Sequence, residues 1–195
     1  MNRLELKWHG PFSFSEIIKK EKESFDVSEG GGVYLWLYRV DNNDTIYYIG
    51  KSAGKPNNLY MRHFLHYMHF IGGLWNIPAG FPIGKSEWIP SPSPKINKDS
   101  EVMVSTIFDK KKFKEHVDRA FTFANQLSIY LSPVEPKNAI SGVERNLLFD
   151  IKPMGTIQGT KTEPKNKILI SHINAGWAFE KIKEKLEKKG HIFKS

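Results

Sequence analysis

The sequence between residues 32 and 67 reads GVYLWLYRV (32–40), DNNDT (41–45), IYYIG (46–50) and KSAGKPNNLYMRHFLHY (51–67). The first run alternates and is rich in β-branched and aromatic residues, which favours a strand over a helix. Aspartate and asparagine at 41–44 predict a turn, and Gly50 ends the second run. The residues after it indicate a loop and then a helix from about Asn58 to Phe70. The expected order is strand, hairpin, strand, helix.

Two tyrosines in this stretch stand beside glycine, in the tripeptides GVY (32–34) and YIG (48–50). Glycine lets another group approach the backbone closely. The tripeptides resemble the paired motifs of the GIY-YIG nuclease superfamily, with GVY in place of GIY and YIG unchanged. A helix carrying Arg62 and His66, and a later helix carrying Glu144, follow in the order found in that superfamily. The resemblance covers the hairpin, the first helix and the Glu144 helix, but hardly the remaining half of the chain.

This resemblance implies an α/β (α+β) fold with a small three-stranded, mainly antiparallel sheet flanked by helices. Residues 1–28 are expected to form an N-terminal flap, with a helix at Ser15–Ser24, and residues 29–195 the nuclease-like domain. A long insertion at about 71–118 is expected between the first core helix and the third strand, because the segment from 71 to 100 is rich in Gly, Pro, Trp and Ser and has no regular period. The third strand is predicted at 121–131.

The resemblance also implies metal-dependent hydrolysis of DNA phosphodiesters, with Glu144 holding Mg²⁺ or Mn²⁺ and Arg62 binding the scissile phosphate. Tyr34 would act as the general base or orient the attacking water, and Tyr48 would complete the hydrogen bonds around that water. An ordinary phenol, with a pKa near 10, is a poor base at neutral pH. Positive charge from Lys51 or Arg62, or a metal-held water, is therefore expected to lower the pKa of Tyr34.

The helix at 58–70 offers a second base. Arg62, His66 and His69 recur at i, i+4 and i+7 and so share one face. Arginine can bind phosphate through two hydrogen bonds, and a histidine one turn away can deprotonate a water, which makes His66 the rival of Tyr34. A basic helix surface is the plain structural alternative. Three histidines on this helix do not predict zinc, because His63 and His69 fall on different faces.

Glu144 has two readings. Its position on the inward side of a helix at 141–151 requires a cation or a donor to offset desolvation. Ser141 three residues earlier makes a capping box, a purely structural explanation. The resemblance favours a metal ligand. It also raises an asparagine after this helix as a further site residue, and both Asn174 and Asn166 are candidates.

The composition favours an anionic partner. The chain has 195 residues, a net charge of +8 and a pI near 9.5, which points to nucleic acid. Lys111 and Lys112, in a basic helix that Asp109 is expected to cap, are the candidates for additional DNA contacts. The absence of cysteine excludes disulfides and thiolate metal sites.

No apolar run approaches the length of about 20 residues that a membrane helix needs, and no signal-peptide core stands at the N-terminus. A cytoplasmic protein without a membrane partner is therefore expected. Two alternatives stay open at this stage: RNA as the substrate, and a nucleic-acid-binding module that keeps the fold without catalysis.

Overall fold

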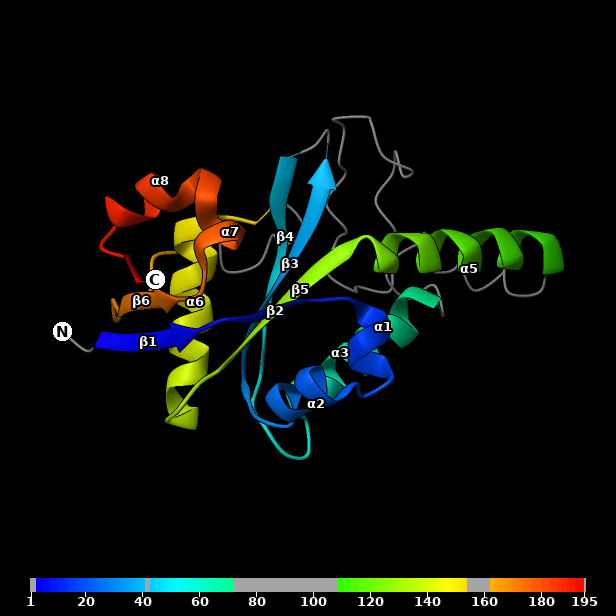
Figure 1. Ribbon diagram of the computed structural model, residues 1–195, viewed down its shortest axis with the longest axis horizontal. Helices are drawn as coiled ribbons and strands as arrows, with labels where there is room; N and C mark the ends of the chain where they lie inside the picture. The colour runs from blue at the N-terminus through cyan, green and yellow to red at the C-terminus, as the bar shows by residue number, and fades with distance from the viewer. Residues whose placement is uncertain (1–2, 41–42, 72–108, 154–161, 195) are drawn as a thin grey trace.

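The computed structural model describes residues 3–40, 43–71, 109–153 and 162–194. Its strands form a four-stranded antiparallel sheet of order β2-β5-β3-β4 and a three-stranded parallel sheet of order β1-β6-β7 (Figure 1). The strands are β1 (Arg3–Lys7), β2 (His9–Phe12), β3 (Gly32–Val40), β4 (Asn43–Ser52), β5 (Leu127–Pro133), β6 (Leu169–Ile173) and β7 (Ile192–Lys194). The helices are α1 (Phe14–Ile18), α2 (Lys22–Ser28), α3 (Leu59–Ile71), α5 (Lys110–Asn125), α6 (Ile140–Ile151), α7 (Gly176–Phe179) and α8 (Lys183–Glu187), with 3₁₀ turns η1 (Lys137–Ala139) and η2 (Glu180–Ile182).

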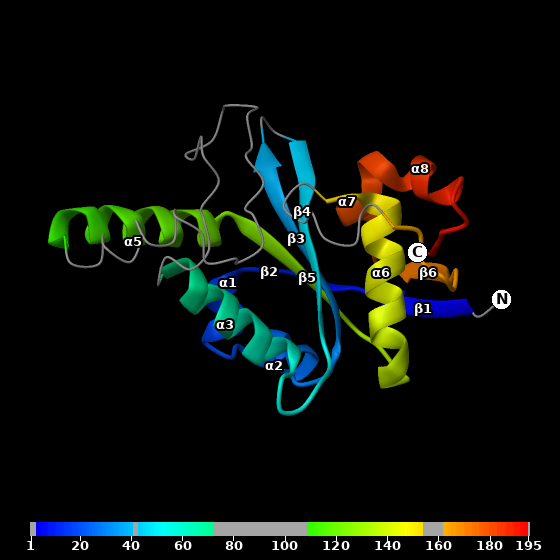
Figure 2. The same cartoon turned by 180° about the vertical axis from the view of Figure 1, so that it is seen from behind.

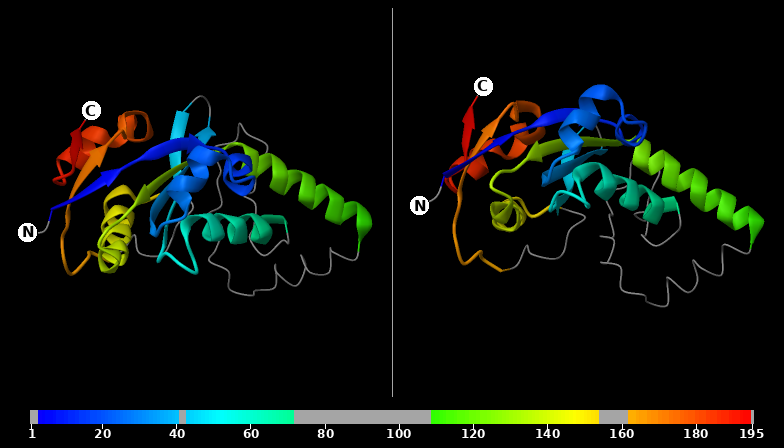
Figure 3. Two further views of the ribbon diagram at one scale, coloured as in Figure 1. Left: turned by 60° about the horizontal axis from the view of Figure 1, so that its bottom comes forward. Right: turned by 90° about the horizontal axis from the view of Figure 1, so that it is seen from below.

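The predicted mixed α/β class is confirmed, whereas the three-stranded sheet is wrong. β2 adds a fourth strand beside β5, and β1, β6 and β7 make a second sheet. The residues expected as a separate N-terminal flap therefore belong to both sheets, and Figure 3 shows β1 beside β6 and continuing into β2. The segment has little local signal for this, because its strands are short and their partners lie more than 100 residues away in sequence.

The hairpin explains where the core lies. Side chains alternate between the two faces of β3. Val33, Leu35 and Leu37 join a cluster packed on α6, whereas Tyr34 and Trp36 join a cluster packed on α1, α3 and α5. Seen from behind, β3 and β4 run between α3 and α6 (Figure 2). Because both faces are covered, β3 is buried along Val33 to Tyr38.

Helices α3 and α5 begin where the sequence predicts, but α5 ends later than predicted. α3 lies within a residue of its predicted range and begins after Asn58, whose side chain accepts a hydrogen bond from the Met61 backbone N–H at 2.8 Å. Asp109 likewise caps α5, accepting from the Lys111 N–H at 3.1 Å. α5 continues to Asn125, however, so the third strand begins six residues later than predicted.

The terminal helices are shorter than predicted. The expected helix at Ser15–Ser24 is divided into α1, capped by Ser13, and α2. The charged sequence from Trp177 to Lys189 also predicts one helix, and the structure divides it into α7, η2 and α8. Much of the predicted insertion, at 72–108, lies outside the described residues, and residues 110–118 form the first half of α5. In the described parts of the chain, no helix combines the length and the apolar character needed to cross a membrane.

Candidate functional site

The site begins at the cross-strand pair of Tyr34 on β3 and Gly50 on β4. A Cβ atom at Gly50 would overlap the hydroxyl and the ring of Tyr34. The glycine of the YIG tripeptide therefore makes room for the tyrosine of the GVY tripeptide. β4 is an edge strand, so this close approach lies at the border of the sheet.

The Tyr34 hydroxyl points to α3. Its oxygen lies 2.6 Å from Nε2 of His66, and both residues are buried. The Tyr48 ring lies roughly parallel to that of Tyr34, with the centroids 6.0 Å apart, and the two hydroxyls interact by hydrogen bonding. Tyr48 is only partly buried. A hydrogen-bonded row thus runs from Tyr48 near the surface through Tyr34 to His66 in the interior.

Burial changes the pKa values of Tyr34 and His66, and at Tyr34 the change is opposite to the predicted one. Burial, followed by the neighbouring Tyr48, raises the pKa of Tyr34 well above its ordinary value, and the opposing effect of Arg62 is smaller. Arg62 does lower the Tyr34 pKa, but the expected net lowering is wrong, because desolvation outweighs the cation. Burial and then the Arg62 charge hold the pKa of His66 well below its ordinary value. Both groups are neutral at pH 7.

Arg62 leaves α3 beside these phenols and hydrogen-bonds with the hydroxyls of Tyr34 and Tyr48. Its Nε is buried and has no hydrogen-bond partner among the described residues. A buried donor of this kind ordinarily has a partner in protein or water. The Nε–H of Arg62 is therefore an unsatisfied buried donor in the described part of the chain.

His63, to which the sequence pattern assigned no role once a zinc site was set aside, has a structural role. The Trp36 indole N–H donates to His63 Nε2 at 3.1 Å, and His63 Nδ1 lies 2.7 Å from the Leu59 carbonyl oxygen. Tryptophan is a donor only, so Nε2 is the acceptor and Nδ1 carries the proton. This neutral imidazole fixes α3 against β3, one turn before His66.

Glu144 reaches the same place from the other face of the sheet. Along β4, Tyr48 and Gly50 face α3, whereas Lys51 faces α6. The Lys51 ammonium lies 2.8 Å from the Glu144 carboxylate and donates to the Ser141 hydroxyl at 3.1 Å. The Glu144 charge is near enough to raise the pKa of both Tyr34 and Tyr48. Tyr34 and Glu144, which are 110 positions apart in the sequence, thus belong to one site at the edge of β4.

The capping reading of Glu144 is wrong. α6 begins after Ala139, where no side chain caps the helix, and Ser141 is already inside it. The Ser141 hydroxyl instead accepts from Lys51. Glu144 is therefore held by a cation and not by the helix terminus.

Glu144 is the carboxylate in this site that could hold a divalent cation. Among the described residues, no three His, Cys, Asp or Glu side chains gather as a metal site. Mg²⁺ is commonly held by one or two carboxylates and completes its shell with water and substrate phosphate. Glu144, with 19% of its side chain exposed, fits that kind of single-carboxylate site. Lys51 would have to release the carboxylate.

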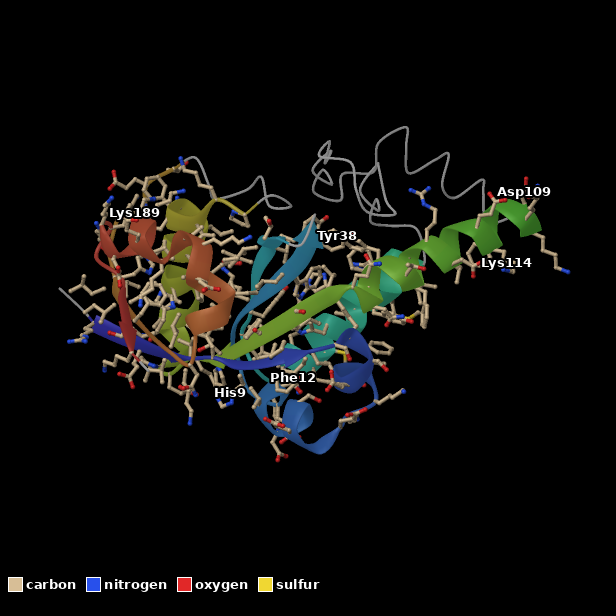
Figure 4. All side chains as sticks on the ribbon, turned by 45° about the horizontal axis from the view of Figure 1, so that its top comes forward. His9, Phe12, Tyr38, Asp109, Lys114 and Lys189 are labelled. Atoms are coloured by element: carbon tan, nitrogen blue, oxygen red, sulfur yellow. The ribbon has the colours of Figure 1, made fainter. Side chains whose placement is uncertain are left out.

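Other predicted residues lie elsewhere. Lys111 and Lys112 are in the first turn of α5, at the end that extends beyond the other described elements, and Figure 4 shows Asp109 and Lys114 at this end. Asn174 lies in the turn after β6 with φ of 56°, a left-handed conformation that asparagine tolerates well. The backbone carbonyl of Asn166 accepts a hydrogen bond from buried Asn146, which ties α6 to the segment before β6.

Comparisons with protein-family models, with curated proteins and with solved structures find no match for this chain.

Proposed function

We propose that this protein is a divalent-metal-dependent endonuclease that hydrolyses phosphodiester bonds of DNA. The observation that carries the proposal is the meeting of two phenols, a guanidinium, a neutral imidazole and a lysine-paired carboxylate at one edge of the β3–β4 hairpin. In-line phosphoryl transfer needs activation of water and stabilisation of charge around one phosphate. The resemblance to GIY-YIG nucleases supports the same chemistry.

Arg62 binds the scissile phosphate in this proposal. Arg62 as a whole is only partly buried, and a guanidinium group matches two phosphate oxygens at once. It then stabilises the negative charge that increases in the transition state. Lys51, with 39% of its side chain exposed, adds a second positive charge at the same edge.

The attacking water contacts Tyr48, the more exposed of the two tyrosines. Its proton passes along the row from Tyr48 to Tyr34 and from there to Nε2 of His66. A neutral imidazole can accept this proton, and a bound phosphate anion raises the pKa of a nearby histidine. His66 is thus the base, and Tyr34 is the relay that joins it to the water.

Glu144 would hold Mg²⁺ or Mn²⁺ in this site. When bound, the ion supplies Lewis-acid stabilisation of the phosphate and of the leaving oxygen. Lys51 would exchange its partner, leaving Glu144 and turning to a phosphate oxygen. Cytoplasmic location, DNA in place of RNA, and further DNA contacts by Lys111 and Lys112 belong to this proposal as well.

A second candidate is a nucleic-acid-binding module without catalysis. The observation that favours it is the burial of Tyr34 together with the Lys51–Glu144 ion pair, which leaves the carboxylate neutralised. The two functions differ in one experiment. Supercoiled plasmid and linear duplex are incubated with the protein in Mg²⁺, in Mn²⁺ and in EDTA. Metal-dependent nicking supports the nuclease, whereas binding without nicking in either metal supports the module.

A further inference from the structure

The outer face of α3 is apolar, and nothing in the site chemistry uses it. Met61, Phe64, Leu65 and Met68, here named the α3 stripe, have exposed fractions of 36%, 36%, 37% and 48%. The buried residues Leu59, His63, His66 and Phe70 occupy the opposite side of the same helix. An exposed apolar surface with polar groups at its border commonly marks a binding site.

The α3 stripe borders the proposed phosphate site. At about 100° per residue, Arg62 lies roughly 60° around the helix from Leu65, between the stripe and the buried face. A phosphate bound to Arg62 therefore brings the adjoining nucleotides over Leu65 and its neighbours. The partner must then offer an anionic backbone and an apolar surface side by side.

Aromatic groups lie at the other border of the stripe. The Tyr60 and Phe64 rings are nearly parallel, at 26°, with centroids 6.4 Å apart, and the Lys20 ammonium lies 4.8 Å from the centroid of the Tyr60 ring. Phe64 is exposed and Tyr60 is half-buried, and aromatic rings near cations are the groups on which single-stranded nucleic acids stack their bases. A regular duplex hides its base faces in the stack, and its backbone is bound through polar and charged groups.

We infer that the α3 stripe contacts unpaired bases next to the phosphate held by Arg62, so that the substrate class is nucleic acid with a single-stranded or flapped segment. This inference rests on the proposed function for the position of the phosphate. Phe64 supplies a stacking surface, and Leu65 and the methionines act as an apolar wedge of the kind that separates neighbouring bases.

The test uses the full-length protein in EDTA, so that binding is measured without cleavage. Fluorescence anisotropy compares a blunt duplex, the same duplex with a single-stranded flap, and the flap strand alone. The parent protein should bind the last two at least about tenfold more tightly than the blunt duplex. The double variant Phe64→Ala/Leu65→Ala should lose about tenfold on those two ligands, with blunt-duplex affinity and thermal midpoint unchanged. Ile192→Ala, which removes a comparably exposed side chain (38%) from β7 in the other sheet, is the matched control and should behave as the parent.

Equal weakening on all three ligands, or no weakening on any, would overturn the inference. A large fall in the thermal midpoint of the double variant would also overturn it, because the stripe would then pack against another part of the chain. The outcome is separate from that of the cleavage assay. A flap preference without metal-dependent cleavage would reject only the nuclease, and cleavage without a flap preference would reject only this inference.

Discussion

At the scale of single residues, the Tyr34–His66 contact carries the chemistry proposed for this site. Both side chains are buried and neutral, with 2.6 Å between the hydroxyl oxygen and Nε2. Neither group alone is suited to activate water. The phenol keeps its proton at neutral pH because its pKa is raised, and the imidazole is buried away from solvent. Together they form a proton path, provided that Tyr48 supplies its outer end.

Replacing Tyr34 with phenylalanine should therefore reduce cleavage by about 10²–10⁴-fold, the usual contribution of proton transfer. The free energy of unfolding should fall by only about 1–3 kcal/mol, because buried partners lose one hydroxyl. Tyr38→Phe is the matched control, since it removes a buried hydroxyl from the same strand, where it donates to Gln126 at 3.0 Å. The control should lose stability but not cleavage. Equal cleavage by the two variants would remove Tyr34 from the mechanism.

At the scale of elements, the hairpin and its two flanking helices determine which side chains meet. The β3–β4 register places Tyr34 opposite Gly50 and Val33 opposite Lys51. A one-residue slip would turn Tyr34 away from α3 and Lys51 away from α6. The site therefore depends on the register as much as on its residues.

Gly50→Ala tests this dependence. The new methyl group would overlap the Tyr34 ring, so that ring must move from His66 or the strands must separate. Overpacking of this kind costs about 1–3 kcal/mol, and cleavage should fall together with stability. Gly30→Ala is the control, because a Cβ there meets no atom within 4 Å. Thermal unfolding and plasmid cleavage of both variants provide the comparison, and a fully stable, fully active Gly50→Ala protein would refute the close approach.

The link between β4 and α6 makes a different prediction. Lys51 competes with a divalent cation for Glu144, at 2.8 Å in this structure. Lys51→Met should therefore lower the Mg²⁺ concentration required for half-maximal cleavage, while weakening affinity for DNA through the loss of one positive charge. Titration of Mg²⁺ at saturating DNA measures the first effect. A higher Mg²⁺ requirement in the variant would mean that Lys51 assists metal binding and does not oppose it.

At the scale of the whole molecule, each sheet is connected to its surroundings by a tryptophan–histidine pair. Trp36, on β3 of the antiparallel sheet, donates to His63 on α3. Trp8, between β1 and β2, donates to Nδ1 of His172 on β6 of the parallel sheet, at 3.0 Å. His172 Nε2 then lies 2.8 Å from His191 Nδ1, and His191 Nε2 lies 3.1 Å from Asp150. Since tryptophan only donates, His172 Nδ1 accepts and its Nε2 carries the proton, so the protons of this second row point toward the carboxylate.

Acid should therefore destabilise the protein. Burial lowers the pKa of His63 to about 4 and that of His172 to about 3. Below pH 6.5 the unfolded chain takes up protons that the native state excludes, so stability falls from pH 6.5 down to those values, by up to about 1.4 kcal/mol per pH unit for each histidine. Denaturant unfolding between pH 7.5 and 4 measures this. A His172→Asn variant should be less stable at pH 7.5 yet show a shallower pH dependence, and parallel curves would contradict the assignment.

The sequence predicts the hairpin, α3 and α6 closely, because their patterns are local: alternation, a turn and an amphipathic repeat. It does not predict the pairing of β1 with β6 or of β2 with β5, which are contacts between distant short segments. In the site, it is the resemblance to GIY-YIG nucleases that implied a common place for Tyr34, Arg62 and Glu144, and the structure brings these three side chains near one another. Tyr34 burial and the Lys51–Glu144 pair depend on packing across the sheet edge, for which the sequence has no direct signal.

The central claim is that Glu144 serves phosphodiester hydrolysis and not the fold. The most direct measurement is plasmid cleavage by Glu144→Gln in Mg²⁺, with thermal midpoint and DNA affinity determined on the same preparation. The amide keeps the shape but loses the charge that holds a divalent cation, so cleavage should fall by orders of magnitude while stability and affinity persist. A folded, DNA-binding Glu144→Gln protein that cleaves as fast as the parent would contradict the account.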